Sequence, residues 1–338
     1  CRIRGQGGKG WGFARDREPP LYFLLLSTNT INALGNMRRS KKMPKTVNRK
    51  SRLGALPWIF PALFMIFGFV LWPAFEMIRT SFQEVSTSGI TQGWAGLENY
   101  RTLLVNPDLP NVLIRTFIWV VGIVFFTILI SLPVAQLLNA KYPGRKLVRW
   151  AVIIPWAASV VMSSTIWKWI LDPYYGVLNK MAMDLKIFTE PVDFLANPKH
   201  SFAWLMLVAV FVSIPFTSFV ILAGLSTIPD DIVEASTVDG ATAWKGYRHI
   251  KFPLIKPALL VAMAINLINI FNAFPIIWVI TGGGPGYETD TTTTLGYKIS
   301  FRDQDIGQSA SMASINLIII LAFIGIFLKV SKSQERNS

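Results

Sequence analysis

Charged side chains are scarce in this chain. Of its 338 residues only 15% are Asp, Glu, Lys or Arg, whereas 52% are hydrophobic, and the mean hydropathy is +0.43. A soluble domain of this length carries about 25% charged residues. The deficit indicates that lipid, rather than water, surrounds much of the protein surface.

Cysteine and histidine are almost absent as well. The one cysteine, Cys1, excludes an internal disulfide framework and a cysteine-based zinc site. Two histidines, His200 and His249, are too few for a histidine-rich metal site, so no metal site is predicted. The sequence contains no H-E-x-x-H motif, and no histidine is placed to activate a serine. We therefore assign no catalytic residue.

The first 36 residues differ in character from the rest. They begin with Cys rather than Met, and their longest apolar run, Leu21–Leu26, is too short to span a membrane. Met37 is followed by a basic cluster that is typical of a cytoplasmic tail. We interpret residues 1–36 as non-native or disordered upstream sequence and residues 37–55 as the tail. The rival interpretation is a lipid-modified Cys1, although no signal peptide is visible.

Six apolar windows in the remaining chain are long enough to cross a bilayer, for which about 20 residues are needed. The windows are Leu56–Ile78, Ile114–Leu138, Val148–Leu171, Ala203–Leu225, Ala258–Ile280 and Ser311–Val330. Several contain proline, which membrane helices tolerate because neighbouring groups satisfy the freed carbonyls. The sequence thus predicts an all-α integral membrane protein with six spans in residues 56–330, followed by a cytoplasmic tail at 331–338.

Basic residues are distributed unequally between the two sets of connections. The tails and loops on one side of the predicted spans hold nineteen Lys and Arg, and those on the other side hold seven. The side rich in Lys and Arg is normally cytoplasmic. We therefore expect a multi-pass protein of the bacterial inner membrane with both termini in the cytoplasm. This bias also accounts for the net charge of +14 without a nucleic-acid partner.

The cytoplasmic connection at residues 226–257 is too long for a simple hairpin. Its residues predict a short helix, capped by Ser226 or Thr227, with Pro229 in the first turn and Gly240 after the last. Four acidic residues on this segment would be repelled by anionic lipid, which disfavours a helix lying on the membrane surface. Docking of this helix into a groove of a partner protein is the favoured interpretation.

Three segments of the chain carry a family resemblance. In the 226–257 loop, an acidic residue and small residues precede a glycine, in the order Glu234, Ala235, Ser236, Asp239 and Gly240, with Ile250 and Pro253 after them. This pattern resembles the EAA loop of binding-protein-dependent ABC importer permeases, with Ser236 in place of a second Ala and Phe252 in place of Leu. The segment 167–179 is similar to a segment of carbohydrate permeases. The segment 281–297 is similar to a segment of the first permease subunit of maltose-type transporters.

The resemblance covers roughly Gly54 to Val330 and implies a type I ABC importer permease fold. It implies a permease subunit of an ATP-driven importer that forms half of the path for a sugar, polyol or sugar-derived osmolyte by alternating access. The implied partners are a second homologous permease, two ABC ATPase subunits and an extracytoplasmic solute-binding protein. Residues Glu234, Ala235, Ser236, Asp239 and Gly240 would contact an ATPase. The ATPase subunits would bind ATP and Mg²⁺, and no cofactor is expected in this chain, which lacks a G-x-x-x-x-G-K-[ST] motif. The chain itself is therefore not expected to be an enzyme.

Asparagines mark the fifth window. Asn266, Asn269 and Asn272 are spaced i, i+3, i+6, which places them on one helix face. Such amides are costly in an apolar helix unless they face a partner or a wet cavity. The three asparagines are equally consistent with interhelical hydrogen bonds, worth about 0.6 kcal/mol each, and with the lining of a solute path. For Asn269 and Asn272 we favour the solute path. Further candidates for the path are Ser213, Thr217, Ser311 and Ser314.

Other function classes fit the sequence less well. A secondary, ion-coupled carrier is the main alternative, but no Asp, Glu or Arg lies firmly inside the fourth to sixth windows. An intramembrane enzyme would need a catalytic constellation, and a pure scaffold would not need the asparagines. The solute stays open among a mono- or disaccharide, a polyol, a sugar-derived osmolyte and glycerol phosphate. The last is disfavoured because the same windows hold no Arg.

Overall fold

The computed structural model describes residues 56–335. The interpretations of residues 1–36 and 37–55, and the end of the C-terminal tail, lie outside this range. The chain divides at Phe69 into two units, which are described separately. Within the first unit lie α3 (Leu56–Ile66) and the start of the π-helix η1 (Phe67–Leu71). The range Pro57–Thr80 is apolar and long enough to cross a membrane, as predicted for the first window.

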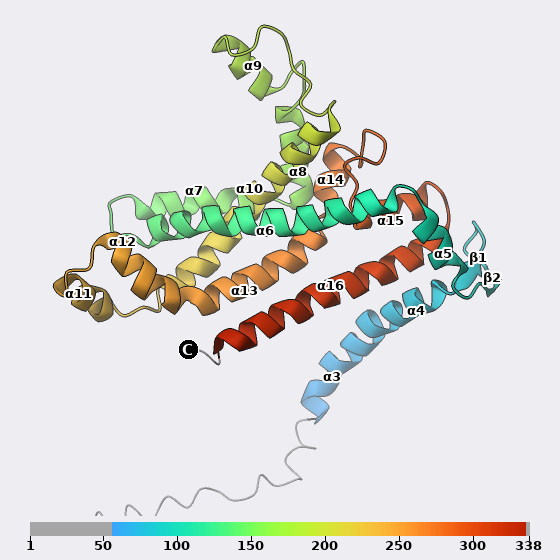
Figure 1. Ribbon diagram of the computed structural model, residues 1–338, viewed down its shortest axis with the longest axis horizontal. Helices are drawn as coiled ribbons and strands as arrows, with labels where there is room; N and C mark the ends of the chain where they lie inside the picture. Colours follow the sequence, from blue (N-terminus) through green and yellow to red (C-terminus); the bar gives the residue numbers. More distant parts are fainter. Residues whose placement is uncertain (1–55, 336–338) are drawn as a thin grey trace, which may run out of the picture. The chain divides into compact units, whose positions relative to one another are not determined.

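The second unit, from Val70 onward, is almost entirely helical and contains one small hairpin (Figure 1). Strands β1 (Gln83–Val85) and β2 (Thr91–Trp94) pair antiparallel. The helices are α4 (Trp72–Thr80), α5 (Glu98–Val105), α6 (Leu109–Asn139), α7 (Arg145–Ala157), α8 (Val160–Ile170), α9 (Val177–Asp184), α10 (Pro198–Leu225), α11 (Asp230–Val238), α12 (Ala243–Gly246), the π-helix η2 (Tyr247–Lys251), α13 (Phe252–Phe271), α14 (Phe274–Ile280), α15 (Thr292–Phe301) and α16 (Ile306–Glu335).

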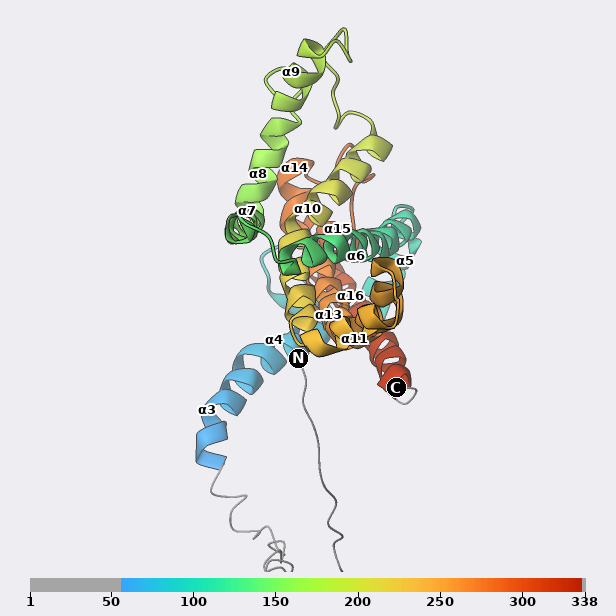
Figure 2. The ribbon, with the colours of Figure 1, turned by 90° about the vertical axis from the view of Figure 1, so that its left-hand side faces the viewer.

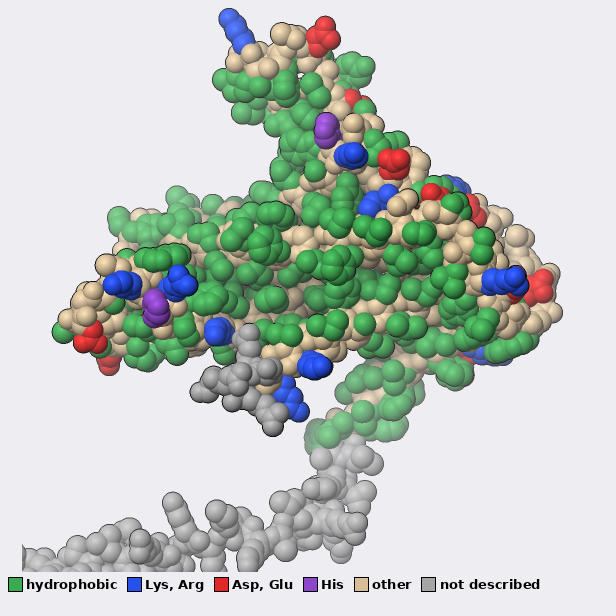
Figure 3. All heavy atoms as spheres, viewed as in Figure 1, with side chains coloured by type: hydrophobic (Ala, Val, Ile, Leu, Met, Phe, Trp, Pro, Cys, Tyr) green, Lys and Arg blue, Asp and Glu red, His purple; other side chains and the backbone are tan. Residues whose placement is uncertain are grey.

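Within the described range, five helices are long and apolar enough to span a bilayer, or six if the bent pair α7 and α8 is counted as one span. The predicted all-α membrane fold is thus confirmed, apart from the short hairpin. The last helix continues to Glu335, five residues beyond the predicted end of the sixth window. Hydrophobic side chains cover much of the surface of α6 and α16, as a lipid-facing surface requires (Figure 3).

Two predicted spans are not single helices. The window Val148–Leu171 bends by 95° between α7 and α8, where Ser159 is extended and its side chain accepts a hydrogen bond from the backbone of Met162. The window Ala258–Ile280 ends its first helix at Phe271 and starts again at Phe274. Proline accounts for the second break, because Pro275 opens α14 and disfavours a helical conformation at the residue before it, whereas Pro155 lies inside α7, which continues to Ala157 before the first break.

Helices α6, α10 and α13 form the centre of the second unit. Leu205, Val208 and Ile123 are buried in the first of its hydrophobic clusters, and Trp119 donates an indole hydrogen bond of 3.0 Å to the carbonyl of Ile270. A separate cluster joins α5, α6, α15 and α16. In both ribbon views, α8 and α9 project away from this centre as an arm (Figure 2). The first break therefore lies where the arm leaves the packed helices, whereas α14, after the second break, still buries Ile276, Ile277 and Ile280 in the first cluster.

Candidate functional site

A cavity of about 450 Å³ lies between the two broken helices and the middle of α10. Its lining is Trp156, Ala158, Val160, Ala209, Val212, Ser213, Phe216, Asn266, Ile268, Asn269, Ile270, Asn272, Ala273, Pro275 and Ile276. Ligand pockets typically have about 300–1,000 Å³ and apolar walls with a few polar groups. The cavity has this character, and none of its lining residues is charged.

The three asparagines of the fifth window have different surroundings. Asn266 is only 3% exposed, and its amide donates hydrogen bonds of 2.8 Å to the hydroxyl of Thr217 and the carbonyl of Ala262. Asn269 is exposed, and Asn272, at the end of α13, is exposed while donating to the carbonyl of Ile268 at 3.0 Å. Asn266 thus joins two helices, whereas the other two amides are open to the cavity.

Only one of the four predicted hydroxyl residues lines the cavity. Ser213 does so, with its hydroxyl donating to the carbonyl of Ala209 at 2.7 Å. Thr217 is fully buried and cannot reach a solute in this structure. Ser311 and Ser314 are also buried and lie outside this lining, and their hydroxyls donate to main-chain carbonyls. Hydroxyls packed between membrane helices commonly donate to main-chain carbonyls in this way, and a sequence pattern does not show whether they do.

The predicted docking helix exists as α11, but its start differs from the prediction. Neither Ser226 nor Thr227 caps it, because their hydroxyls donate back to the carbonyls of Leu222 and Gly224 at the end of α10. The helix begins after Pro229 without a side-chain cap. Its predicted stop is confirmed, since Gly240 has φ +80°, a conformation that favours glycine.

The residues of the EAA-like pattern divide into an exposed and a buried set. Glu234, Ala235, Asp239 and Gly240 are exposed. Ser236 is 8% exposed, its hydroxyl donates to the carbonyl of Val233, and it faces Gly246 of α12, where a Cβ would lie 3.7 Å from its oxygen. A small residue at position 236 therefore lets α11 pack against α12.

Helix α12 leads without interruption into the span that carries the asparagines. The helical segment from Ala243 to Phe271 includes α12, η2 and α13. The cavity amides of Asn269 and Asn272 thus sit at one end of a helical rod whose other end contacts α11. An exposed ion pair of 2.9 Å between Lys141 and Asp230 also links α11 to the α6–α7 connection. Helix α11 is thus connected to the cavity by one continuous helical segment.

The segment 167–179 fixes the junction between α8 and α9 within the arm. Asp172 accepts hydrogen bonds from the backbone of Tyr174 and Tyr175, which closes a tight turn. Asn179 is fully buried, donates to three main-chain carbonyls including that of Val192, and accepts from the Val192 amide at 3.0 Å. At Gly176 a Cβ would collide with carbonyl oxygens of the turn. This segment is therefore a structural anchor.

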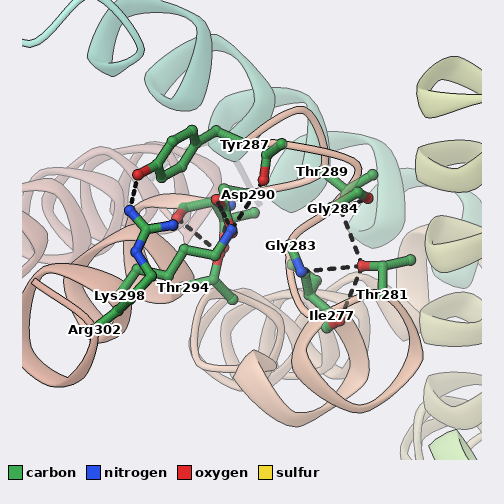
Figure 4. A network of polar contacts seen from close by, with 12 residues as sticks. Ile277, Thr281, Gly283, Gly284, Tyr287, Thr289, Asp290, Thr294, Lys298 and Arg302 are labelled. Carbon is green, nitrogen blue, oxygen red and sulfur yellow. Dashed lines mark hydrogen bonds and ion pairs between the residues drawn. The ribbon is translucent and has the colours of Figure 1, made fainter.

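A buried ion pair organises the loop between α14 and α15 (Figure 4). Lys298 Nζ lies 2.6 Å from Asp290 Oδ2, with the two side chains 7% and 0% exposed. Burial raises the pKa of the Asp290 carboxyl, an effect that the neighbouring Lys298 ammonium opposes. Arg115 of α6 donates to the carbonyls of Asp290 and Tyr287 at 3.2 and 2.8 Å. Nothing in the spacing of these three charged residues along the sequence shows that they meet.

Comparison with known proteins identifies the family. Residues 127–333 match the family of binding-protein-dependent transport system inner membrane components. The chain is 35% identical over 279 residues to a probable ABC transporter permease protein of Brucella suis, covering 82% of this chain and 96% of the relative. It is 30% identical over 288 residues to the trehalose/maltose transport system permease protein MalF of Thermococcus litoralis, covering 85% and 96%. The chain belongs to this family of ABC transporter permeases.

The fold is that of solved type I permeases. The structure of a bacterial alginate ABC transporter in complex with a periplasmic protein bound to an alginate pentasaccharide contains a chain that matches with a TM-score of 0.73 and 22% identity, covering 84% of this chain and 96% of that one. This chain is thus a membrane-spanning permease subunit of a binding-protein-dependent transport system. Nothing in these comparisons supports the secondary carrier that the sequence left open.

Proposed function

We propose that this permease forms half of the translocation path for a neutral sugar or sugar-like solute, which it passes by alternating access during ATP-driven import. The observation that carries this proposal is the uncharged cavity with the exposed amides of Asn269 and Asn272. Amides both donate and accept hydrogen bonds, which suits hydroxyl groups, and the apolar wall suits the faces of a sugar ring. The name of one relative, the trehalose/maltose transport system permease protein, supports this class of solute, because both of these sugars are neutral.

A second, homologous permease would complete the path. Helix α7 has no buried residue, and Leu147, Trp150 and Ile154 on it are 66–74% exposed. Trp156 at the end of α7 is both 49% exposed and part of the cavity lining. A partner that covers α7 would therefore also close the cavity on that side.

Two ABC ATPase subunits, which would bind the ATP and Mg²⁺, are the proposed source of energy, and α11 is the proposed contact with one of them. The exposed residues Glu234, Asp239 and Gly240 offer a docking surface, and the continuous rod from Ala243 to Phe271 offers the lever. The excess of Lys and Arg supports an orientation in which α11 and both termini lie in the cytoplasm. A solute-binding protein would then deliver the solute at the opposite end.

Two glycine variants test the ATPase contact. No atom lies within 4 Å of a Cβ placed on Gly240, so a side chain added there projects from the free surface. Gly240→Ala and Gly240→Trp both force an L-residue into φ +80°, but only the tryptophan adds bulk. We expect the ATPase to co-purify with the wild type and Gly240→Ala and not with Gly240→Trp. Equal recovery from all three proteins would refute this contact.

The cavity is tested by comparing two amides of one helix. In proteoliposomes containing the whole transporter, Asn269→Leu should lower uptake of the transported sugar at least tenfold while ATP hydrolysis in the absence of sugar continues. Asn266→Leu removes the same amide from a buried position. It should lower stability but leave the half-saturating sugar concentration unchanged. Unchanged uptake in Asn269→Leu would refute the role of this exposed amide in the solute path.

A further inference from the structure

A second hollow of about 380 Å³ lies next to the cavity, between α14, α15 and α16. We call it the outer groove, and its lining includes Asn272, Tyr297, Ser300, Phe301, Ser309 and Asn316. Asn272 belongs to the lining of both hollows. The outer groove lies beyond the end of α13 that is remote from α11, so it is a neighbour of the cavity on the side from which solute would arrive.

Stacked aromatic rings form one wall of the outer groove. Tyr297 lies at the centre of this wall, with ring centroids 4.5 Å from Phe301, 4.9 Å from Phe274 and 4.5 Å from Trp278. The rings come from both α14 and α15, so they hold each other in place. Phe301, at the end of the row, is 69% exposed. A rigid, exposed aromatic face is a ready surface for the apolar face of a ligand ring.

Unengaged polar groups form the opposite wall. The Oδ1 atom of Asn316 on α16 is buried and has no hydrogen-bond partner among the described residues. Leaving a buried acceptor unmatched costs about 1–3 kcal/mol, and an apolar span offers few substitutes. Ser309 donates its hydroxyl to the carbonyl of Gly296 at 2.9 Å, which leaves its oxygen able to accept. No charged residue lines the outer groove.

We propose that the outer groove is a second sugar subsite, which the solute occupies before it enters the cavity. This inference rests on the function proposed above. A pyranose ring would stack on Phe301 and Tyr297, and one of its hydroxyls would donate to Asn316 Oδ1. Asn272, shared by both linings, would contact the sugar in either position. The ligand class is a neutral sugar, because the groove offers an aromatic face and hydrogen-bonding groups but no charge.

Site-directed labelling tests this subsite in the complete transporter. Cys1 is the sole cysteine, so Cys1→Ser gives a cysteine-free background. In this background, Ser300→Cys places a thiol in the outer groove, Ser213→Cys places one in the cavity, and Ser88→Cys places one on the exposed β1–β2 turn. Labelling by a methanethiosulfonate is measured with maltose or trehalose, and with sorbitol as the osmotic control. We expect either sugar to slow labelling at positions 300 and 213, but not at position 88.

The outcomes separate the subsite from the proposed function. Protection of Ser213→Cys without protection of Ser300→Cys would overturn the subsite and leave the cavity as the path. Absence of protection at both positions, with both sugars, would overturn the subsite together with the proposed sugar path. Labelling of Ser300→Cys in the isolated permease but never in the complex, with or without sugar, would show that a protein partner fills the outer groove and would also overturn the subsite.

A ring substitution sharpens the test. Phe301→Ala removes an exposed ring, so the fold should tolerate it. It should raise the sugar concentration needed for half-protection of Ser300→Cys roughly fivefold, which corresponds to about 1 kcal/mol. Phe301→Tyr keeps the aromatic face and should restore protection. Unchanged protection in Phe301→Ala would refute the stacking.

Discussion

The ion pair in the α14–α15 loop makes a quantitative prediction. Lys298→Met removes the ammonium but keeps much of the side chain, and it leaves the fully buried carboxylate of Asp290 without the partner that lies 2.6 Å away. Breaking a buried pair in this way costs about 3–5 kcal/mol. We expect the free energy of unfolding, measured by SDS titration in mixed micelles, to fall by that amount. Lys180→Met, which removes an exposed lysine from α9, should change it by less than about 0.5 kcal/mol.

A double variant tests the physical reason for this loss. If the loss comes from an unpaired buried charge, Asp290→Asn combined with Lys298→Met should be more stable than Lys298→Met alone, because no charge then remains. We expect the double variant to recover at least about 2 kcal/mol. If the effects of the two single substitutions add to within about 0.5 kcal/mol, the residues are not coupled and this reasoning is refuted.

The same variant should respond to pH with a definite sign. Burial already raises the pKa of Asp290, and removal of Lys298 takes away the group that opposes this rise. A carboxyl whose pKa is higher in the folded than in the unfolded protein destabilises the fold above its folded pKa, and this cost disappears as the pH falls through that value. The difference in stability between wild type and Lys298→Met should therefore shrink as the pH is lowered from neutral towards the pKa of an unfolded aspartate. A larger difference at acidic pH would contradict the assignment.

Three further predictions concern uncharged residues. Thr217→Val removes the acceptor of the Asn266 hydrogen bond and should cost about 0.6 kcal/mol in the same SDS titration, whereas a cost above about 2 kcal/mol would show that more than one bond is lost. Asn179→Leu leaves the Val192 amide without its partner, so limited trypsin digestion should cleave after Lys186 faster than in the wild type, and an unchanged rate would contradict the anchoring role. Gly176→Ala should increase the same cleavage, because its Cβ would meet carbonyl oxygens. Gly240→Ala should leave it unchanged, because Gly240 lies in the connection between α11 and α12 and not in the segment around Lys186.

The sequence was sufficient to predict the apolar spans, a short helix in the 226–257 loop and its stop at Gly240, but the predicted cap at Ser226 or Thr227 was wrong. Hydropathy decides the spans and the conformational freedom of glycine decides the stop, and both can be read along the chain. The breaks after Ala157 and Phe271 were missed, because a hydropathy window does not distinguish a straight apolar helix from two short ones joined by a bend.

The details of the site depend on contacts between distant segments. The spacing of the asparagines predicted a shared face, but only the structure shows that Asn266 meets Thr217 on α10 whereas Asn269 remains open to the cavity. Asn316 was missed altogether, since one amide in an apolar window gives no periodic signal. The pairing of Asp290 with Lys298 within a folded loop, and its link to Arg115, was likewise not predictable from their spacing.

The two broken helices have a common arrangement, which explains why the motifs at 167–179 and 281–297 lie outside the cavity. Each break lines the cavity, through Ala158 in one case and through Asn272 and Ala273 in the other. The short helix after each break does not continue the hydrogen-bonded backbone of the helix before it. Each of these short helices is followed by a buried side chain or ion pair that makes polar contacts with the surrounding loop. Asn179 holds the first, and the pair of Asp290 and Lys298 holds the second. Irregular backbone at membrane depth persists only where protein groups satisfy it. The motifs at 167–179 and 281–297 therefore support the cavity walls from outside the cavity lining, whereas Tyr297 of the second motif lines the outer groove.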